Sequence, residues 1–541
     1  MNFANFKYQL LIVLIALLLF VPFLGAVHLF DWDEINFAEC AREMIATGNY
    51  FSVQINFQPF WEKPPLFIWM QALSMNSFGI NEFSARLPNA ICGIITLLVL
   101  FNIGKKLYDV KFGLLWVLVY AGSFLPHFYF KSGIIDPWFN LFIFCGIYYF
   151  ILFGVKKNVS FLVVSALFIG LAVLTKGPVA VLIVGLCVAA YWAINRFQPI
   201  ITFSQILIFS ISTVSIGGLW FLLLLLTGNV SVIKEFFIYQ MRLFNSQDSG
   251  HGGFFFYHWV ILLVGCFPSS IFALRAFFKN GRDLPSHKNF KLWMMILFWI
   301  VLILFSIVKT KIVHYSSLCY FPLSFLSAYT LYKLLNGEMQ WKKAIGFLMV
   351  FIASLIGIAI MALPFVDKYK YLIINSGVIH DTFAVENMKA NVYWSGYEWL
   401  IGAFLITGTI VALMFIKKGS LQKGLVGVFT VSLITVNLSA LIIAPRIEQY
   451  SQRAAIEFYE QLQNKDCYVE TLGFKSYAHL FYSHKKPPTN KNSYSIDWLL
   501  NGVIDKPVYF VSRINNVNEV KHNYPQLKEL YRKNGFVFFT R

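Results

Sequence analysis

Apolar runs of about twenty residues recur along this chain and constrain its fold more than any other feature. A helix of that length crosses the hydrocarbon core of a bilayer. With 58% hydrophobic and only 13% charged residues, the chain is too apolar for a soluble domain. About thirteen runs can be counted: roughly 8–27, 87–104, 112–130, 134–154, 160–175, 177–194, 203–227, 257–278, 291–308, 315–335, 343–364, 398–416 and 424–444. The sequence therefore predicts an α-helical polytopic membrane protein with about thirteen transmembrane helices.

The net charge of +18 raises the alternative of a nucleic-acid-binding protein. If the N-terminus is cytoplasmic and the runs alternate in direction, about eighteen Lys and Arg residues and about three acidic residues fall in short cytoplasmic loops. The opposite loops are nearly neutral. This is the positive-inside bias of a membrane protein, so we expect membrane lipids and no nucleic acid as partners. The first run lacks a clear small-x-small cleavage site, and we expect a retained anchor rather than a signal peptide.

Three external segments are long enough to carry function, at 28–86, 228–256 and 365–397, and a polar tail follows residue 444. We expect two domains, a membrane domain over 1–444 and a small extracytoplasmic α/β domain over 445–541. The expected tail elements are a helix over 453–462, strands over 467–472 and 507–513, a helix over 524–533 and a last strand over 536–540.

The first external segment predicts two short helices. Over 35–48, apolar residues recur at i, i+3, i+4 and i+7, with charged residues opposite, which is typical of an amphipathic helix lying in the membrane interface. Gly48 is a stop signal for that helix. A second helix is expected to begin at Pro64–Pro65 and to end near Gly79.

Three acids stand together in Asp31-Trp32-Asp33-Glu34, directly after the first apolar run. One alternative is a capping box made by Asp31 and Glu34. Three carboxylates in four residues exceed what a cap needs, and a carboxylate at a membrane face can act as general base on an acceptor hydroxyl. We expect Asp33 in that role, with Asp31 as the second choice.

Two further motifs place charge at the start of a helix. In Glu62-Lys63-Pro64-Pro65 the prolines favour an extended Lys63, a point charge suited to a phosphate. The alternative is a Glu–Lys surface pair. In Asp136-Pro137 an acid begins the fourth apolar run, where it is costly. The alternative is a cap or a pair with Lys131.

Cations gather at span ends on the same, less basic side. Three separate apolar runs have a cation at or beside one end: Lys176, Arg242 and Lys311. Tyr315 follows four residues after Lys311. Each lysine alone can be a snorkelling residue. Together they favour an anionic ligand such as a lipid phosphate or pyrophosphate, because Lys, Arg and Tyr are the donors that a leaving phosphate needs.

The sequence gives no support for a metal centre, a disulfide or a cofactor. The seven cysteines include no CxxC pair. His251 and His258, with Glu62 or Asp248, could form a metal site, but no short ligand motif accompanies them. We therefore expect no metal and no cofactor, and we expect His314 to be an acceptor-site or hydrogen-bonding residue.

At these motifs the chain resembles a known family. The motifs DExxFAExAREM from Asp33, EKPPLxxW from Glu62 and FGxNEFSARLP from Phe78 resemble the bacterial aminoarabinose transferases. Those enzymes, with the protein O-mannosyltransferases, form part of the GT-C glycosyltransferases (family 39-like). The resemblance continues in order through IDP at 135–137, LTKG at 174–177, QMRLF at 240–244 and KTK at 309–311.

The resemblance implies a GT-C fold and an inverting transfer of a sugar from a polyprenyl-phosphate donor to a lipid (lipid A-like), glycan or protein acceptor. It implies a multi-pass protein of the bacterial inner membrane whose active site faces the periplasm. The expected catalytic residues are Asp33, Asp136 and Glu34. The expected substrate-binding residues are Lys63, Arg242, Tyr315, Lys176, Lys311, Glu62, Arg42 and His314.

The chain departs from the family pattern at three points. The aminoarabinose enzymes are expected to read Lys-Leu-Pro-x-Tyr where this chain reads KIVHY from Lys311. Phe37 and Asn36 stand where tyrosine and arginine are usual. The sugar and acceptor can therefore differ from aminoarabinose and lipid A.

Two other classes compete with an enzyme. A transporter or lipid-linked-sugar flippase predicts ionisable groups and broken helices near the bilayer midplane. A structural membrane protein predicts no convergence of the acidic and basic clusters. If Asp33, Lys63, Arg242 and Tyr315 share one external cavity, the enzyme is favoured.

Overall fold

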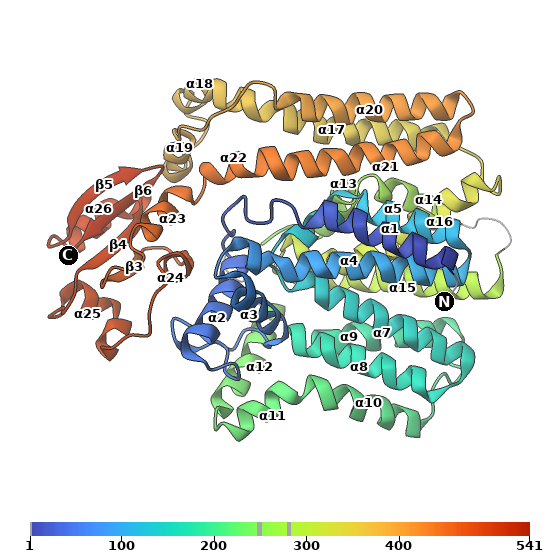
Figure 1. Cartoon of the computed structure of the whole chain (residues 1–541), viewed down its shortest axis with the longest axis horizontal. Coiled ribbons are helices and arrows are strands. Elements are labelled where there is room, and N and C mark those ends of the chain that lie inside the picture. Colours follow the sequence, from blue (N-terminus) through green and yellow to red (C-terminus); the bar gives the residue numbers. More distant parts are fainter. Residues whose placement is uncertain (1–2, 246–251, 279–282) are drawn as a thin grey trace.

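The computed structural model describes residues 3–245, 252–278 and 283–541. Most of the chain forms a bundle of helices that run side by side, and the C-terminal sheet lies beyond one end of the bundle (Figure 1). The N-terminus lies at the opposite end.

Within the described residues, seven helices are long and apolar enough to cross a membrane, or ten if each of three bent pairs counts as one span. The seven are α4 (Glu82–Leu107), α7 (Asp136–Lys156), α8 (Val159–Lys176), α15 (Pro285–Ile307), α17 (Lys343–Lys368), α20 (Trp399–Lys417) and α21 (Leu421–Leu438), which continues through a π-helical turn, η3 (Ser439–Ile443), into α22 (Ala444–Gln449). Shorter apolar helices are α1 (Phe3–Phe20), α9 (Val179–Ile194) and α16 (Tyr320–Leu335). The chain is a polytopic helical membrane protein, and the count of about thirteen spans stays a prediction.

Three of the expected spans are bent. The pairs are α5 (Val110–Ala121) with α6 (Phe124–Phe128) and η1 (Tyr129–Lys131) at 82°, α10 (Phe203–Gly217) with α11 (Leu219–Leu226) at 55°, and α13 (Tyr257–Gly265) with α14 (Ser269–Ala276) at 112°. Gly217 and Gly218 lie at the second break and Pro268 at the third. Glycine and proline at these points explain the bends, because proline lacks the N–H for the helical ladder and glycine adds no side chain to resist bending.

The first external segment forms both expected helices. α2 (Asp33–Thr47) ends at Gly48, whose φ of 68° is the left-handed conformation that glycine adopts at low cost. A short hairpin of β1 (Gln54–Ile55) and β2 (Gln58–Pro59) leads to α3 (Leu66–Phe78). The structure differs from the prediction in one respect: the charged face of α2 is buried, because α3 packs beside it and the C-terminal domain covers it.

The tail forms a four-stranded sheet in the order β3-β4-β6-β5, from β3 (Tyr468–Leu472), β4 (Val508–Arg513), β5 (Lys528–Lys533) and β6 (Phe536–Thr540). β3 and β4 are parallel, and the other pairs are antiparallel. The helices around the sheet are α23 (Arg453–Glu460), α24 (Ala478–Tyr482), α25 (Ile496–Asn501) and α26 (Val517–Asn523). The expected helix over 453–462 and the expected strands are confirmed.

The helix expected over 524–533 is wrong, because most of that segment is the edge strand β5. The signal against a helix is the turn Asn534-Gly535, where both residues have positive φ (47° and 76°). An Asn-Gly pair in this conformation closes a tight hairpin. The polar residues of β5 fit an exposed edge strand as well as a surface helix.

One apolar cluster joins the first external segment to the tail. It contains Leu29, Phe37 and Phe67 from the N-terminal part together with Tyr459 and Phe538 from the C-terminal part. The tail is therefore packed onto the external segment rather than tethered to it, and the predicted domain division at 444/445 stays a prediction.

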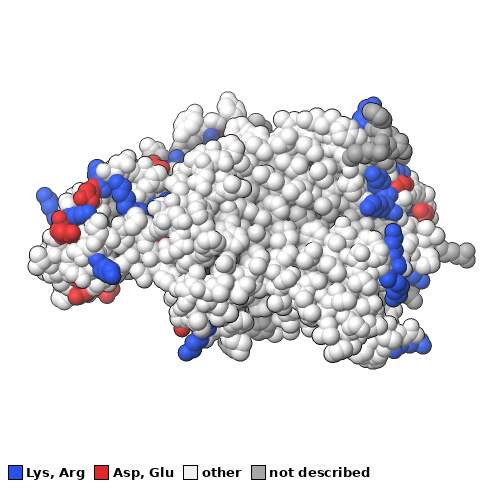
Figure 2. Space-filling model, turned by 60° about the horizontal axis from the view of Figure 1, so that its bottom comes forward, with Lys and Arg blue, Asp and Glu red and all other residues white. Residues whose placement is uncertain are grey.

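Charged side chains avoid the middle of the molecule. Figure 2 shows Lys and Arg collected at the end of the bundle away from the tail, mixed charges on the tail, and an almost uncharged band between them. That band is the part that lipid would surround.

Candidate active site

Two carboxylates meet at one imidazole on the tail side of the bundle. Asp33 is the first residue of α2, Asp136 is the first residue of α7, and His314 lies in the 3₁₀ turn η2 (Val313–Cys319). The Nε2 atom of His314 is 3.3 Å from Oδ2 of Asp33 and 4.0 Å from Oδ2 of Asp136. Residues almost 300 positions apart thus form one polar cluster.

A lysine completes the inner part of this cluster. The Nζ atom of Lys176, at the end of α8, lies 2.6 Å from Oδ1 of Asp136. The same ammonium is 5.4 Å from the ring centre of Tyr315. Asp136 is only 2% exposed, and its Oδ2 has no hydrogen-bond partner in the described part of the chain. That oxygen is available to a ligand.

A second pair of cations lies nearby on a shared aromatic ring. Tyr239 and Arg242 belong to α12 (Val230–Asn245), and Lys63 precedes α3. The Tyr239 ring centre is 5.0 Å from Nζ of Lys63 and 5.3 Å from Cζ of Arg242. The two cations therefore lie close together although they come from separate external segments.

Lys63 and the inner cluster share one electrostatic environment. Burial lowers the pKa of Lys63, and the charges of Glu62, Asp33 and Asp136 oppose that shift while Lys176 adds to it. These effects need short distances, so the two groups of side chains belong to one site.

His314 is neutral at neutral pH. Burial lowers its pKa, against the opposing charges of Asp136 and Asp33. An imidazole that carries its proton on Nε2 can donate to the Asp33 carboxylate at this distance. The contact orients the Asp33 carboxylate beside Asp136.

An apolar cavity of about 820 Å³ opens beside the polar cluster. His314, Asp31 and Glu34 form part of its polar wall. Its other walls come from the end of α1, from α6 and η1, and from α21 and η3: they include Leu19, Phe23, Phe128, Ile434 and Leu441. A cavity with a polar wall and apolar sides suits an amphiphile better than a soluble sugar.

Glu34 lines this cavity, but its carboxylate is engaged elsewhere. It accepts two hydrogen bonds from Arg86, at 2.8 and 3.0 Å, and others from the backbone N–H groups of Phe30 and Gly133. Burial raises its pKa, but Arg86 and these hydrogen bonds outweigh burial and lower it. The alternative of an Asp31–Glu34 capping box is not formed, since the N-cap of α2 is Trp32 and makes no side-chain cap. Glu34 therefore holds the loop through these contacts, and a catalytic role for it stays a prediction.

Two other expected substrate ligands have structural partners. Arg42 is 3% exposed and forms a bidentate pair with Glu39 at 2.6 and 2.7 Å. Lys311 donates to the carbonyls of Phe305, Ser306 and Val308, and so caps the C-terminus of α15. Each charge therefore already has partners within the fold, and a role for either residue in substrate binding stays a prediction.

Glu62, another expected ligand, lies close enough to Lys63 and to Tyr477 of the tail for its charge to act on both. Lys131 donates to the carbonyl of Pro22, so the alternative pair of Asp136 with Lys131 is replaced by the pair with Lys176.

Over the described ranges, no group of three His, Cys, Asp or Glu side chains is arranged to hold a metal ion. His251 and Asp248 of the alternative metal site lie outside the described residues. His258 lies within them, and its Nδ1 is 3.1 Å from the hydroxyl of Ser316.

The sequence reasoning missed the residues that hold the Asp31–Glu34 loop. Arg86 stands in the motif SARLP, and its pairing with Glu34 was not foreseen. Gln452 and Tyr482, from the tail, also bond this loop. No local pattern signals either tail residue, because both act on a segment more than 400 residues away.

Known proteins match this chain in sequence and in fold. Residues 62–222 match the family described as dolichyl-phosphate-mannose-protein mannosyltransferase. An undecaprenyl phosphate-alpha-4-amino-4-deoxy-L-arabinose arabinosyl transferase of Photorhabdus laumondii is 25% identical over 346 residues, 62% of each chain. The enzyme with the same description from Pectobacterium carotovorum is 24% identical over 78% of this chain and 77% of its own length.

The fold matches a solved structure over nearly its whole length. The crystal structure of ArnT from Cupriavidus metallidurans bound to undecaprenyl phosphate superposes with a TM-score of 0.76, covering 99% of this chain and 98% of that one at 18% identity. The likeness establishes the polytopic GT-C fold. Together with the sequence matches, it supports a GT-C glycosyltransferase of the aminoarabinose-transferase type.

Proposed function

We propose that this protein transfers a sugar from a polyprenyl-phosphate carrier to a lipid acceptor of the lipid A kind at the periplasmic face of the bacterial inner membrane. One observation carries the proposal: Asp33 and Asp136 converge on His314, while Lys63, Lys176 and Arg242 bring positive charge to the same site. Its relatives carry the description of undecaprenyl phosphate-linked arabinosyl transferases.

The cations would bind the phosphate of the donor. Lys63 and Arg242 lie beside one tyrosine ring and offer an ammonium and a guanidinium, which suit a phosphate ester. Positive charge there also stabilises the phosphate as it leaves, when its negative charge increases. Lys176 would act from the inner side, beside Tyr315.

The transfer step exchanges one bond to the sugar for another. An acceptor oxygen forms a bond to the anomeric carbon on the face opposite the donor phosphate. The bond from that carbon to the phosphate oxygen breaks, and its electron pair leaves with the polyprenyl phosphate, which inverts the anomeric centre. Where the acceptor is a hydroxyl, its proton passes to Asp33. Where it is an ionised phosphate, Asp33 orients the acceptor or stabilises positive charge on the sugar ring.

The apolar cavity gives the lipid part of one substrate a place next to these groups. Its walls are mostly aliphatic and aromatic, and its polar side is shared with the Asp33–His314 contact. The cavity suits the polyprenyl chain of the donor or the acyl chains of a lipid acceptor. The positive end of the bundle away from the tail would face the cytoplasm by the positive-inside rule, and this charge pattern supports a periplasmic site and tail (Figure 2).

The test is transfer by purified protein in lipid nanodiscs. Labelled sugars on undecaprenyl phosphate would be offered with lipid A, with a glycan and with a protein as acceptors. We expect labelled lipid A from wild type and a loss of about 100-fold or more in kcat for Asp33→Asn, the range that one general base supplies. Asp466→Asn, at an exposed carboxylate of the tail, is the matched control and is expected to keep full activity. No transfer from any carrier-linked donor would overturn the proposal.

A further inference from the structure

The loop that carries Asp33 has two sets of anchors. On the membrane side, Arg86 donates to the carbonyls of Leu24, Val27 and His28 and pairs with Glu34. These contacts fix the entry and the exit of the loop. They leave the backbone between Leu29 and Asp31 to other partners.

Those partners come from the C-terminal domain. The amide of Gln452 bonds two loop residues at once: its nitrogen donates to the carbonyl of Leu29, and its oxygen accepts from the N–H of Asp31 at 3.3 Å. The hydroxyl of Tyr482 accepts from the N–H of Leu29 at 2.7 Å. Tyr482 is 3% exposed, so this contact is shielded from water.

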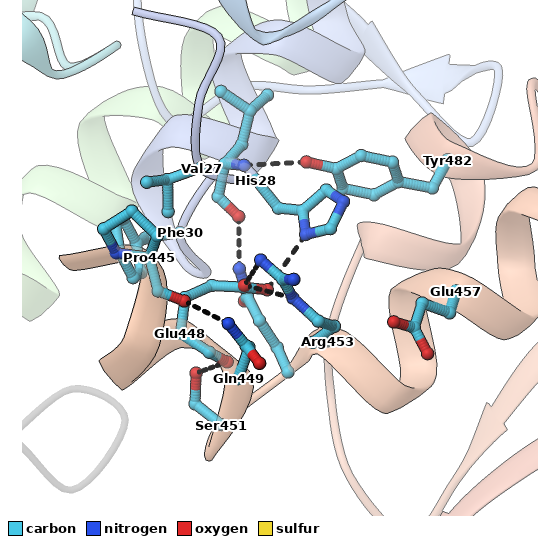
Figure 3. Close-up of polar contacts among 12 residues, drawn as sticks. Val27, His28, Phe30, Pro445, Glu448, Gln449, Ser451, Arg453, Glu457 and Tyr482 are labelled. Atoms are coloured by element: carbon cyan, nitrogen blue, oxygen red, sulfur yellow. Dashed lines mark hydrogen bonds and ion pairs between the residues drawn. The ribbon is translucent and has the colours of Figure 1, made fainter. Parts of the chain in front are cut away.

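Figure 3 shows Tyr482 pointing at the loop beside His28, with Glu448 and Arg453 of the tail close to the His28 ring. Nδ1 of His28 is 2.9 Å from Glu448, whose second carboxylate oxygen binds Arg453 at 2.6 Å. The tail thus binds the loop through neutral hydrogen bonds and through an ion pair.

Contacts between the tail and the loop continue up to Trp32, the residue before Asp33. The ring of Trp32 lies 5.2 Å from that of Tyr477, and Nζ of Lys475 lies 4.7 Å from the Trp32 ring centre. Asp31 faces Ser476, and burial of this carboxyl raises its pKa. Each residue from His28 to Trp32, Phe30 excepted, therefore has a contact in the tail.

We infer that Gln452 and Tyr482 are positioning residues: through the backbone of Leu29 and Asp31 they fix the place of Asp33, so that the C-terminal domain completes the active site. Neither touches the reacting atoms. The inference rests on the proposed function for its catalytic consequence, but the grip on the loop stands on its own contacts.

The geometry gives a reason for the arrangement. Asp33 must reach His314 across 3.3 Å from the first position of a helix that follows an irregular loop. An unfixed loop would move the carboxylate by about an ångström, and a displacement of that size can cost about 100-fold in rate. The Gln452 carboxamide bonds both an N–H and a C=O of the loop, as a neighbouring β-strand would. It therefore fixes the loop backbone although the loop forms no helix or strand.

The experiment compares Gln452→Ala and Tyr482→Phe with a docking control, Asn515→Ala. Asn515 joins the tail to Asp381 of the third external segment at 2.9 Å and does not touch the loop. Deuterium uptake of a peptide covering residues 27–34 reports the loop without needing activity. We expect the exchange rate of this peptide to rise about tenfold in Gln452→Ala and in Tyr482→Phe. In Asn515→Ala we expect the wild-type rate. Unchanged exchange in both would overturn the inference.

Transfer kinetics in the same variants test the consequence. We expect kcat to fall about tenfold or more with the donor KM little changed, because phosphate binding by Lys63 and Arg242 is untouched. In an Asp33→Asn background, Gln452→Ala should cost nothing further. A wild-type kcat in both variants, or full additivity with Asp33→Asn, would overturn the positioning role. If wild type transfers no sugar while exchange rises only in the two loop variants, the proposed function fails and the grip remains supported.

Discussion

Lys63 shows how a short motif sets the properties of one side chain. Two prolines follow it, and the helix α3 begins directly after them. The ammonium is thereby held among Tyr239, Glu62 and the Asp33 cluster instead of in solvent. Burial lowers the pKa of Lys63, so the side chain loses its proton more easily. Phosphate binding needs the protonated, positively charged form.

The pH dependence of donor binding follows from this shift. An exposed lysine loses its proton near pH 10.4, and Lys63 is expected to lose it at a lower pH because burial lowers its pKa. The donor KM should therefore begin to rise at a lower pH than an exposed lysine would predict. Lys63→Arg should remove this rise, because arginine stays charged.

The measurement is the donor KM of wild type and Lys63→Arg over alkaline pH, with Lys418→Arg as control at an exposed lysine. Equal pH dependence in wild type and Lys63→Arg would show that Lys63 does not bind the phosphate in its charged form.

The sequence indicated which charged residues come together in the structure, but it did not indicate the partner of each one. Asp33, Asp136, Lys176 and His314 converge, because charge at the end of an apolar span is costly unless it has a use. Lys311 satisfied the same criterion, and its use is to cap three carbonyls of α15. Spacing along the chain cannot separate these cases, since the partner is decided by tertiary contacts.

Glycine decides how closely two of the apolar helices approach. A Cβ built on Gly402 of α20 would lie 2.1 Å from the carbonyl oxygen of Gly357 of α17. Small residues at such crossings let helix backbones meet inside a bilayer, where burial of apolar surface gives no advantage over lipid.

Gly402→Ala is therefore expected to destabilise the protein by about 1–3 kcal/mol, the usual range for an overpacked contact. The thermal midpoint in detergent would show the loss. Gly185→Ala on α9 is the matched control, because nothing lies within 4 Å of its added Cβ, and alanine favours a helix. An unchanged midpoint for Gly402→Ala would mean that α17 and α20 separate without cost.

Elements with a strong period were predictable, and elements decided by their neighbours were not. Apolar length gave the membrane helices, and Gly48 and Pro64–Pro65 gave the limits of α2 and α3. The helix α2 was expected to lie in the membrane interface, but the tail covers its charged side. β5 was expected to be helical because its polar residues carry no period-two signal, and its pairing with β6 decides its conformation.

The tail and the first external segment form one folded unit. An apolar cluster contains residues of both parts. The tail also holds the Asp33 loop through the hydrogen bonds of Gln452 and through the ion pair of Glu448 with His28. No analysis of either part alone could have found this, because the contacting residues lie more than 400 positions apart. The same contacts make docking of the tail sensitive to pH.

His28 supplies that sensitivity. Burial lowers its pKa, but the hydrogen bond to Glu448 and the charges of Glu448, Glu82 and Glu460 outweigh burial and raise it; the ring of Tyr482 covers one edge. A raised pKa means that the docked state binds the proton more tightly than the unfolded chain does. The contribution is complete below the ordinary histidine pKa of about 6.5 and is lost as pH rises through the raised value.

We therefore expect the free energy of unfolding to fall as pH rises above about 6.5, and His28→Gln to flatten this fall. Thermal midpoints of wild type and variant across that range measure the difference, and His522→Gln, at an exposed histidine of α26, should leave the fall intact. A fall of equal size in His28→Gln would assign the pH dependence to other groups. If His28→Gln also removes the pH dependence of the exchange protection of residues 27–34, the ion pair and the hydrogen bonds of Gln452 and Tyr482 belong to one cooperative contact.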